Sequence, residues 1–251
     1  SDLQTAITKT LFDSGIETSS LDSRIILKEV FCFDEKELIL NSQLIVTKNK
    51  ISEADKILAR RISGEPVSKI FGKRDFYKST FLISEDVLDP RPETELIIEI
   101  ANNFILDKGY KNFIDLGTGS GCIILSILKD NKSLRALGID ISNKAINIAQ
   151  KNCSNLNLEK QATFLVSNWL SKVSGSYDLI ISNPPYIPSK DVDTLSANVK
   201  NYDPLISLDG GEDGLKCYRQ IAEDINRVIG KNGRVVLEIG YNQAEDVIKI
   251  F

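Results

Sequence analysis

The chain contains no histidine, no methionine and a single tryptophan among its 251 residues. Without an imidazole it lacks both a common general base and the commonest metal ligand of proteins, and we expect no metal site. Its four cysteines form no C-x-x-C pair, which argues against a disulfide framework. With no secretory signal visible, we interpret Cys32, Cys122, Cys153 and Cys217 as reduced, mostly buried thiols of a cytoplasmic protein.

Long apolar runs and an excess of basic residues are also missing. No run approaches the length of about 20 residues that crosses a bilayer, so no membrane span is expected. Lysine and arginine number 31 against 35 acidic residues, a formal net charge of −4, which argues against a broad basic surface for nucleic acids. An apolar fraction of 42% and a charged fraction of 26% are ordinary for a globular protein. The length suits one large domain, alone or with a small second one.

The spacing of apolar residues distinguishes two segments that precede the main part of the chain. Residues 1–63 have helical periodicity, with Leu3, Ile7 and Leu11 on one face, and a Gly-Glu-Pro sequence ends this part. Residues 64–90 contain a short β segment that begins near Lys69. We interpret 64–90 as a hairpin that links a small helical domain to a larger one.

From residue 91 to residue 251, strand and helix patterns alternate, which predicts an α/β fold with a parallel sheet covered by helices on both faces. We predict strands at 112–116, 134–139, 162–166, 177–182 and 233–239, and helices near 93–107, 121–130, 143–154, 214–229 and 242–250. In open α/β sheets, ligands bind beyond the carboxyl ends of the strands. The residues that follow each strand are therefore the first candidates for a functional site.

The tetrapeptide Asn183-Pro184-Pro185-Tyr186 directly follows the apolar run 177–182, which we interpret as a buried strand. Proline offers no donor to a strand ladder and fixes its own φ, so the strand must end here in a stiff loop. The Asn183 side chain holds a carbonyl acceptor and an amide donor in one plane, which suits a planar amide or amino group. A loop that merely ends a strand is the alternative, and a second motif upstream disfavours it.

That second motif is the glycine-rich turn Gly-Thr-Gly-Ser-Gly at residues 117–121, between an apolar strand and a helix. Glycines let a backbone turn sharply and approach a ligand, and the helix behind them offers free N–H groups. The spacing is G-x-G-x-G rather than the G-x-G-x-x-G of dinucleotide-binding oxidoreductases. Asp140 ends the next strand, about twenty residues on, where an acid receives ribose hydroxyls in doubly wound folds. The turn, the acid and the Asn-Pro-Pro-Tyr loop are stronger evidence together than any of them alone.

With these motifs the sequence resembles the class I S-adenosylmethionine-dependent methyltransferases that have an N-P-P-Y loop, and most of all the peptide chain release factor glutamine methyltransferases. Further matching stretches are Asp89-Pro90-Arg91-Pro92-Glu93-Thr94-Glu95, Ser167-Asn168-Trp169, Gly210-Gly211-Glu212-Asp213-Gly214-Leu215 and Val236-Leu237-Glu238-Ile239-Gly240. Two departures, Asn168 for a common Asp and Asp203 for a common Glu, keep the polar character. The resemblance implies a Rossmann-like sheet of seven strands behind a small N-terminal helical domain, so the last two strands are expected beyond Phe251.

The resemblance also implies the chemistry, which is methyl transfer from S-adenosylmethionine with S-adenosylhomocysteine as product. The residues that it implies for the cofactor are Gly117, Thr118, Gly119, Ser120, Gly121, Asp140, Asn168, Trp169 and Asn183. Asn183 and the backbone carbonyl of Pro184 are implied to accept both hydrogens of a substrate amide, against which Tyr186 stacks. These residues and Pro185 would form the substrate site. No strong general base is needed, which fits the lack of histidine.

The substrate implied by the resemblance is the glutamine of the Gly-Gly-Gln motif in peptide chain release factors. We expect segment 1–63 to dock this protein, and the enzyme to be a cytoplasmic monomer without nucleic-acid or membrane contacts. A ribosomal-protein glutamine would suit the same loop. DNA adenine N6-methyltransferases share the N-P-P-Y loop and flip a base out of the duplex, but the acidic balance of this chain disfavours them. The intact motifs disfavour a non-catalytic binding module, and the glycine spacing disfavours a nicotinamide oxidoreductase.

Overall fold

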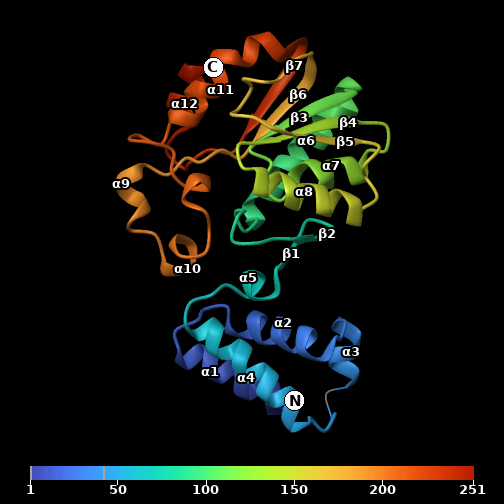
Figure 1. Ribbon diagram of the computed structural model, residues 1–251, viewed down its shortest axis with the longest axis vertical. Coiled ribbons are helices and arrows are strands. Elements are labelled where there is room, and N and C mark those ends of the chain that lie inside the picture. The colour runs from blue at the N-terminus through green and yellow to red at the C-terminus, as the bar shows by residue number, and fades with distance from the viewer. Residues whose placement is uncertain (1, 42) are drawn as a thin grey trace. The chain divides into compact units, whose positions relative to one another are not determined.

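The computed structural model describes residues 2–41 and 43–251. Ser1 and Ser42, both within the predicted helical segment 1–63, lie outside the described residues. The chain divides into two compact units, Ser1–Gly72 and Lys73–Phe251, which are drawn as ribbons in Figure 1. Each unit has its own hydrophobic core, so each has the anatomy of a domain.

The first unit is built from short helices. Its described residues form α1 (Asp2–Asp13), α2 (Ser19–Phe31), α3 (Glu35–Leu40), α4 (Lys48–Ile62) and α5 (Val67–Phe71). Apolar residues at helical spacing make its core, where Ile7 and Leu11 of α1 cluster with Ile26 of α2. Arg61 Nε of α4 lies 2.7 Å from Asp22 Oδ2 of α2, and the two side chains are only 11% and 8% exposed. Losing one partner of such a buried pair is costly, so the pair fixes how α2 and α4 meet.

The boundary between the units falls at Gly72, later than the end of the predicted helical segment 1–63. The prediction of β structure from Lys69 is wrong for this stretch, because α5 forms there and Phe71 packs against the core of the first unit. Gly72 ends α5 with a φ of 66°, a left-handed conformation that favours glycine. The predicted hairpin does form, as β1 (Lys73–Phe76) and β2 (Ser79–Leu82), but within the second unit. The predicted linker 64–90 is thus divided between the two units.

The second unit contains a parallel sheet of five strands. They are β3 (Asn112–Leu116), β4 (Arg135–Asp140), β5 (Ala162–Val166), β6 (Tyr177–Ser182) and β7 (Ile229–Leu237), in the order β5-β4-β3-β6-β7. All four neighbouring pairs are parallel, which confirms the predicted α/β fold. β7 begins at Ile229, before the predicted start at residue 233. Its glycines resemble a turn in the sequence, but pairing with β6 across a register shift draws them into the strand.

Helices cover both faces of this sheet, as Figure 1 shows. On one face lie α6 (Glu95–Lys108), α7 (Cys122–Asp130) and α8 (Asn143–Asn155), and on the other lies α11 (Lys216–Val228), with α12 (Ala244–Ile250) packed against it. The side chains of β3 alternate between the faces, as the period of two in a strand requires. Phe113 packs with α6 and α7, whereas Ile114 packs with α11.

Several short elements escape sequence reasoning. A 3₁₀ turn, η1 (Pro92–Thr94), precedes α6, and the segment between β6 and α11 forms α9 (Ser189–Val192), α10 (Ala197–Lys200) and η2 (Leu205–Ser207). Helices of four residues are too short for a 3.6-residue period to reveal. Within residues 2–41 and 43–251, no helix has both the length and the apolar character that a membrane crossing needs.

The strand order reverses next to β3. From β3 the chain moves outward to β4 and β5, then returns with β6 on the opposite side of β3. In open α/β sheets, the crevice at such a reversal, beyond the carboxyl ends of the strands, is the usual ligand site. The glycine turn follows β3 and the Asn183 loop follows β6. The topology therefore brings these two motifs to the same edge of the sheet.

Candidate active site

The loop from β3 to α7 is a tight turn with three glycines in the left-handed region. Gly117, Gly119 and Gly121 have φ values of 71°, 55° and 79°, which other residues adopt only with strain. A Cβ on Gly121 would lie 3.1 Å from Leu125 Cδ1 and 3.2 Å from the Ala149 Cβ. The backbone conformation thus requires all three glycines. Gly121 is required for a second reason, because α7 and α8 leave no room for a side chain there.

The carboxylate of Asp140, at the end of β4, is held by two backbone groups. Gly119 N donates a hydrogen bond to its Oδ2 at 2.9 Å, and Ser142 N donates to its Oδ1 at 2.9 Å. Burial raises the pKa of Asp140 above its usual value, and these N–H groups act in the opposite direction. Because each carboxylate oxygen has more than one lone pair, Asp140 can hold the glycine turn and still accept hydrogen bonds from a ligand.

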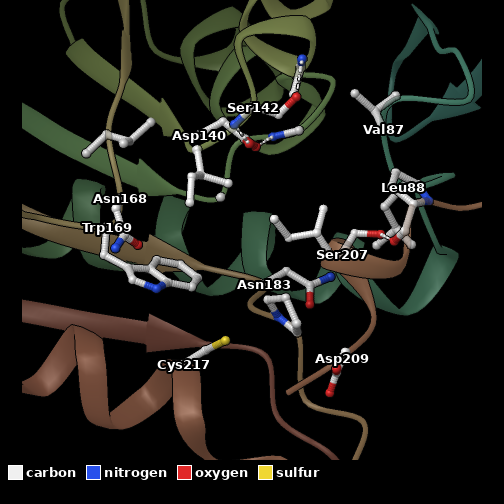
Figure 2. A pocket seen from close by; sticks show the side chains of 18 of the residues that line it. Val87, Leu88, Asp140, Ser142, Asn168, Trp169, Asn183, Ser207, Asp209 and Cys217 are labelled. Carbon is white, nitrogen blue, oxygen red and sulfur yellow. Dashed lines mark hydrogen bonds between the residues drawn. The ribbon is translucent and has the colours of Figure 1, made fainter. Parts of the chain in front are cut away.

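A cavity of about 320 Å³ opens beside these groups. Small-molecule sites have volumes of about 300–1,000 Å³, so the cavity is large enough for one. Figure 2 shows Trp169 on one side of it, Val87 and Ser207 on the other, and Asn183 between them. The predicted site residues that line it are Gly117, Gly119, Asp140, Asn168, Trp169, Asn183 and Pro185.

The indole of Trp169 is fixed from two directions. Its Nε1 donates a hydrogen bond to Gln220 Oε1 of α11 at 2.9 Å. Its backbone has a φ of 44°, which is rare for a residue other than glycine. Such strain persists only where the surroundings impose the conformation. The ring faces Gly117, where an added Cβ would lie 3.8 Å away, so the ring and the glycine turn together bound one end of the cavity.

A second cavity, of about 210 Å³, adjoins the first, and Pro184 and Tyr186 line it. Asn183 lines both cavities. Its Nδ2 donates a hydrogen bond to Thr94 Oγ1 of η1 at 3.1 Å, which leaves its carbonyl oxygen available to a ligand. Two cavities that share a polar side chain suit a reaction between two bound molecules.

The walls of both cavities are tied together by an ion pair in which the acid is buried and the arginine is partly exposed. Arg91 Nη2 lies 2.7 Å from Asp203 Oδ2, and the Asp203 side chain is 1% exposed. Asp203 Oδ1 also accepts a hydrogen bond from Asp89 N at 3.0 Å. These contacts join the loop that supplies Leu88 to the segment that supplies Ser207, and both residues line both cavities. No local sequence pattern indicates this role of Asp203.

Asp115 is a second acid near the glycine turn that sequence reasoning did not single out. It is fully buried at the end of β3, and its Oδ2 accepts a hydrogen bond from Thr118 Oγ1 at 2.7 Å. Its Oδ1 is buried with no hydrogen-bond partner in the described part of the chain. Burial raises the pKa of Asp115 to about 7, and the charge of Asp140 adds to this effect. A charged oxygen without a partner is expensive to bury, so ionised Asp115 destabilises the fold.

Asp115→Asn should therefore raise the free energy of unfolding by about 1–2 kcal/mol near pH 8. Because the pKa is raised from 3.8 to about 7, the stability that Asp115 contributes is full below about pH 4 and is lost as the pH rises to about 7. Asparagine stays neutral, but its amide hydrogens need acceptors, which limits the gain. Urea titrations at about pH 5 and about pH 8 measure the free energy of unfolding of the variant and of the wild type. The difference between the two proteins should be larger at the higher pH. An equal difference at both would mean that Asp115 does not titrate in this range.

Three predicted residues of the glycine turn lie behind the cavity rather than on its lining. The Thr118 hydroxyl is used by Asp115, and the Ser120 carbonyl accepts a hydrogen bond from Asn152 Nδ2 at 2.8 Å. The contact of Thr118, Ser120 and Gly121 with a cofactor stays a prediction. Lining residues that sequence reasoning missed include Asp86, Val87, Leu88, Pro204, Ile206, Ser207, Asp209, Lys216, Cys217 and Gln220. These ten residues come from loops and from α11, which the sequence predicts only as a helix near 214–229.

A five-stranded parallel sheet with this strand reversal, in which a glycine turn, a strand-end acid and an Asn-Pro-Pro-Tyr loop surround one cavity, defines a class I methyltransferase. Residues 79–199 match the methyltransferase small domain, and residues 2–72 match the PrmC N-terminal domain. The hMettl16 catalytic domain, solved in complex with a MAT2A 3′UTR hairpin, has a similar fold. Its TM-score is 0.56 at 17% identity, over 77% of this chain and 73% of that chain.

Relatives with assigned activities cover nearly the whole chain. It is 38% identical to a release factor glutamine methyltransferase of Agrobacterium fabrum, over 98% of this chain and 86% of the relative. The corresponding protein of Caulobacter vibrioides is 37% identical over 98% of this chain and 86% of its own length. That of Rhodospirillum rubrum is 39% identical over 93% of this chain and 72% of its own length. The chain belongs to the release factor glutamine methyltransferase family, and it is an S-adenosylmethionine-dependent methyltransferase.

Proposed function

We propose that this enzyme transfers the methyl group of S-adenosylmethionine to the side-chain amide nitrogen of the glutamine in the Gly-Gly-Gln motif of a peptide chain release factor. The observation that most favours this reaction is the position of Asn183, which lines both cavities and has its carbonyl oxygen available. One cavity would hold the methyl donor and the other the acceptor amide. S-adenosylhomocysteine would leave as the second product.

The residues of the larger cavity fit an S-adenosyl group. Asp140 would accept hydrogen bonds from the ribose hydroxyls, and Asn168 and Trp169 would border the adenine. The turn at residues 117–121 would pass close to the methionine end, where a side chain on Gly117 would narrow the space before the Trp169 ring. When bound, the cofactor supplies a methyl group already activated by a sulfonium. The protein then needs only to hold donor and acceptor in line and exclude water.

The smaller cavity offers two acceptors for the hydrogens of a primary amide. Asn183 Oδ1 would accept one hydrogen, and the backbone carbonyl of Pro184 would accept the other. An amide nitrogen is a poor nucleophile because its lone pair is delocalised into the carbonyl. Two fixed acceptors would aim that lone pair at the methyl group and stabilise the positive charge that develops on nitrogen. Tyr186, which lines this cavity, would stack against the planar amide.

Labelled S-adenosylmethionine, offered with a release factor, a ribosomal protein or duplex DNA, tests this proposal. We expect label on the release factor, and mass spectrometry should assign it to the glutamine of the Gly-Gly-Gln motif. A release factor in which that glutamine is replaced by alanine is the matched control and should stay unlabelled. Label on the ribosomal protein alone would indicate the sister reaction, and label on DNA alone would overturn the proposal.

We also infer that the enzyme works in a reducing compartment such as the cytoplasm. Cys122, Cys153 and Cys217 are free, buried thiols. Burial raises the pKa of Cys122 to about 12, although the hydrogen bond with Ser120 acts in the opposite direction. A buried thiol with so high a pKa is unreactive, so these cysteines are structural.

The first unit would dock the release factor, since every residue that lines the two cavities comes from the second unit. Large apolar side chains are exposed on the first unit, with Ile39 at 70%, Leu40 at 80% and Ile45 at 92%. We expect removal of residues 1–72 to raise the KM for the release factor at least about tenfold, while cofactor affinity stays nearly unchanged. Replacing Ile39, Leu40 and Ile45 with serine in the full chain should also raise the KM for the release factor. If the folded truncated enzyme methylates the release factor with an unchanged KM, the first unit is structural only.

A further inference from the structure

Glu238 lies beside the Asn183 loop, at the carboxyl end of β7. Leu237 of β7 pairs with Ser182 of β6, so the next residues along these parallel strands are Glu238 and Asn183. The backbone of Glu238 is held on both sides: its N–H donates to Ser182 O at 3.0 Å, and Tyr218 Oη donates to its carbonyl at 2.9 Å. The side chain of Glu238 therefore starts from a fixed point next to Asn183.

The carboxylate of Glu238 lines the smaller cavity and is incompletely satisfied. Tyr186 Oη donates to its Oε1 over a long 3.4 Å. Its Oε2 is buried with no hydrogen-bond partner in residues 2–41 and 43–251. Burial raises the pKa of Glu238, and the neighbouring charge of Glu93 adds to this, whereas interactions with the side chains of Thr94, Tyr186 and Asn183 lower it. The side chains of Asn183 and Thr94 thus lie close enough to the carboxylate to favour its ionised form.

This arrangement decides which way the Asn183 amide faces. An ionised carboxylate can only accept hydrogen bonds, so an amide next to it must present its NH2 group. The Nδ2 of Asn183 donates to Thr94 Oγ1 at 3.1 Å, and the Thr94 side chain also favours the ionised form of Glu238. The flipped amide would bring Oδ1, with its partial negative charge, against the carboxylate. Glu238 therefore disfavours the orientation in which Asn183 offers the substrate a donor.

We propose that Glu238 is a positioning residue for methyl transfer: its negative charge favours the orientation of Asn183 in which the NH2 group faces Thr94 and the carboxylate, and so directs Asn183 Oδ1 toward the acceptor amide. In this orientation Nδ2 donates to Thr94 Oγ1. A hydrogen bond at the nitrogen of an amide polarises its carbonyl, so Asn183 Oδ1 becomes a stronger acceptor. This inference rests on the proposed glutamine methylation, and it adds a residue that acts through Asn183.

Glu238→Gln tests the proposal, because glutamine keeps the shape but offers both a donor and an acceptor to Asn183. We expect kcat to fall about 10- to 30-fold, with the KM for S-adenosylmethionine unchanged. Glu245→Gln is the control: Glu245 is an exposed acid of α12 that lines neither cavity, so the variant removes a carboxylate without touching Asn183 or Glu238. We expect near-normal turnover from it. Unchanged kcat in a folded Glu238→Gln enzyme would overturn the proposal.

A double-mutant cycle asks whether Glu238 acts through Asn183. In the Asn183→Ala background, Glu238→Gln should cost nothing further, because no amide remains to be oriented. The same fold-loss in both backgrounds would mean that Glu238 acts independently, and would overturn the role proposed here.

The pH dependence of kcat is a readout that a purely structural role of Glu238 would not change, and the NMR signal of the Asn183 side-chain amide is a second. Because the pKa of Glu238 is raised and its ionised form is the active one, kcat should fall as the pH is lowered through that pKa, and Glu238→Gln should lack this fall. Groups facing the carboxylate are Thr94, Glu93, Asn183, Tyr186 and Tyr218.

In protein labelled with ¹⁵N-asparagine, the side-chain signal of Asn183 should shift over the same pH range in the wild type only. This signal needs no substrate. A titrating Asn183 signal without glutamine methylation would therefore reject the proposed function and keep the contact, whereas methylation without a titrating signal would reject the role of Glu238.

Discussion

Asn183→Ala should lower kcat by about 10²–10³-fold, or about 2.7–4 kcal/mol, with little change in the affinity for S-adenosylmethionine. The substitution removes the side-chain acceptor at the junction of the two cavities but leaves the glycine turn, Asp140 and Trp169 in place. The interaction matters most as charge develops on the amide nitrogen, so its loss falls on turnover rather than on cofactor binding. Single-turnover methylation of a release factor and calorimetry with the cofactor measure the two effects separately.

Two further variants make this experiment more specific. Asn242→Ala removes the side chain of an exposed asparagine beyond β7 and should turn over normally. Asn183→Asp keeps the shape and an acceptor but adds a negative charge beside the cofactor sulfonium and beside Glu238. We expect it to be impaired as well, even if it binds the cofactor more tightly. Near-normal turnover by Asn183→Ala would mean that the loop only ends a strand and that the chemistry lies elsewhere.

Asp140→Ala should weaken the binding of S-adenosylmethionine by about 1.5–3 kcal/mol, which is about 10- to 150-fold in Kd. In our proposal the carboxylate accepts hydrogen bonds from the ribose hydroxyls while it holds the N–H groups of Gly119 and Ser142. The variant therefore loses ligand contacts and loosens the glycine turn. Asp130→Ala is the control, since this acid pairs with Lys78 at 2.8 Å and does not line the cavity.

The two contributions of Asp140 can be separated with ligands that differ only in the ribose. Wild-type enzyme should bind adenosine more tightly than 2′,3′-dideoxyadenosine, because only adenosine has the hydroxyls. Asp140→Ala should bind the two almost equally if the carboxylate contacts the hydroxyls. If the variant keeps the full preference for adenosine, another group receives the ribose. Asp86, a second acid that lines the cavity, would then be the first candidate.

The sequence predicted most of the sheet, because a strand's apolar pattern is a local property. Strands β3, β5 and β6 have the predicted limits, and β4 is displaced by one residue. The errors arise where long-range pairing or short length hides the pattern. Residues 229–232 become strand only through an irregular register with β6, and α9 and α10 are too short to show a period. The sequence predicts β structure for residues 69–71, but they belong to α5, whose Phe71 packs against the core of the first unit.

The candidate site was predictable where function depends on residues adjacent in the chain. The glycine turn needs positive φ at three positions, and only glycine adopts these without strain, so its letters are visible in any single sequence. The proline pair after β6 likewise marks a strand end. In contrast, Gln220 contacts Trp169 from α11, and Arg91 pairs with Asp203, which lies 112 residues further along the chain. No local pattern indicates such pairs.

The sequence by itself determined the fold class, the family resemblance and the stretches that follow β3, β4 and β6, since each depends on neighbouring residues and their periodicity. Only the tertiary structure decided what these stretches surround. Thr94 belongs to η1, whereas Asn183 and Glu238 directly follow β6 and β7. They meet because the strand order and the β6–β7 register align three chain segments. The same packing buries Asp115 and raises its pKa to about 7. Burial and through-space contact depend on the whole fold, so they cannot be assigned to any residue from its neighbours in the chain.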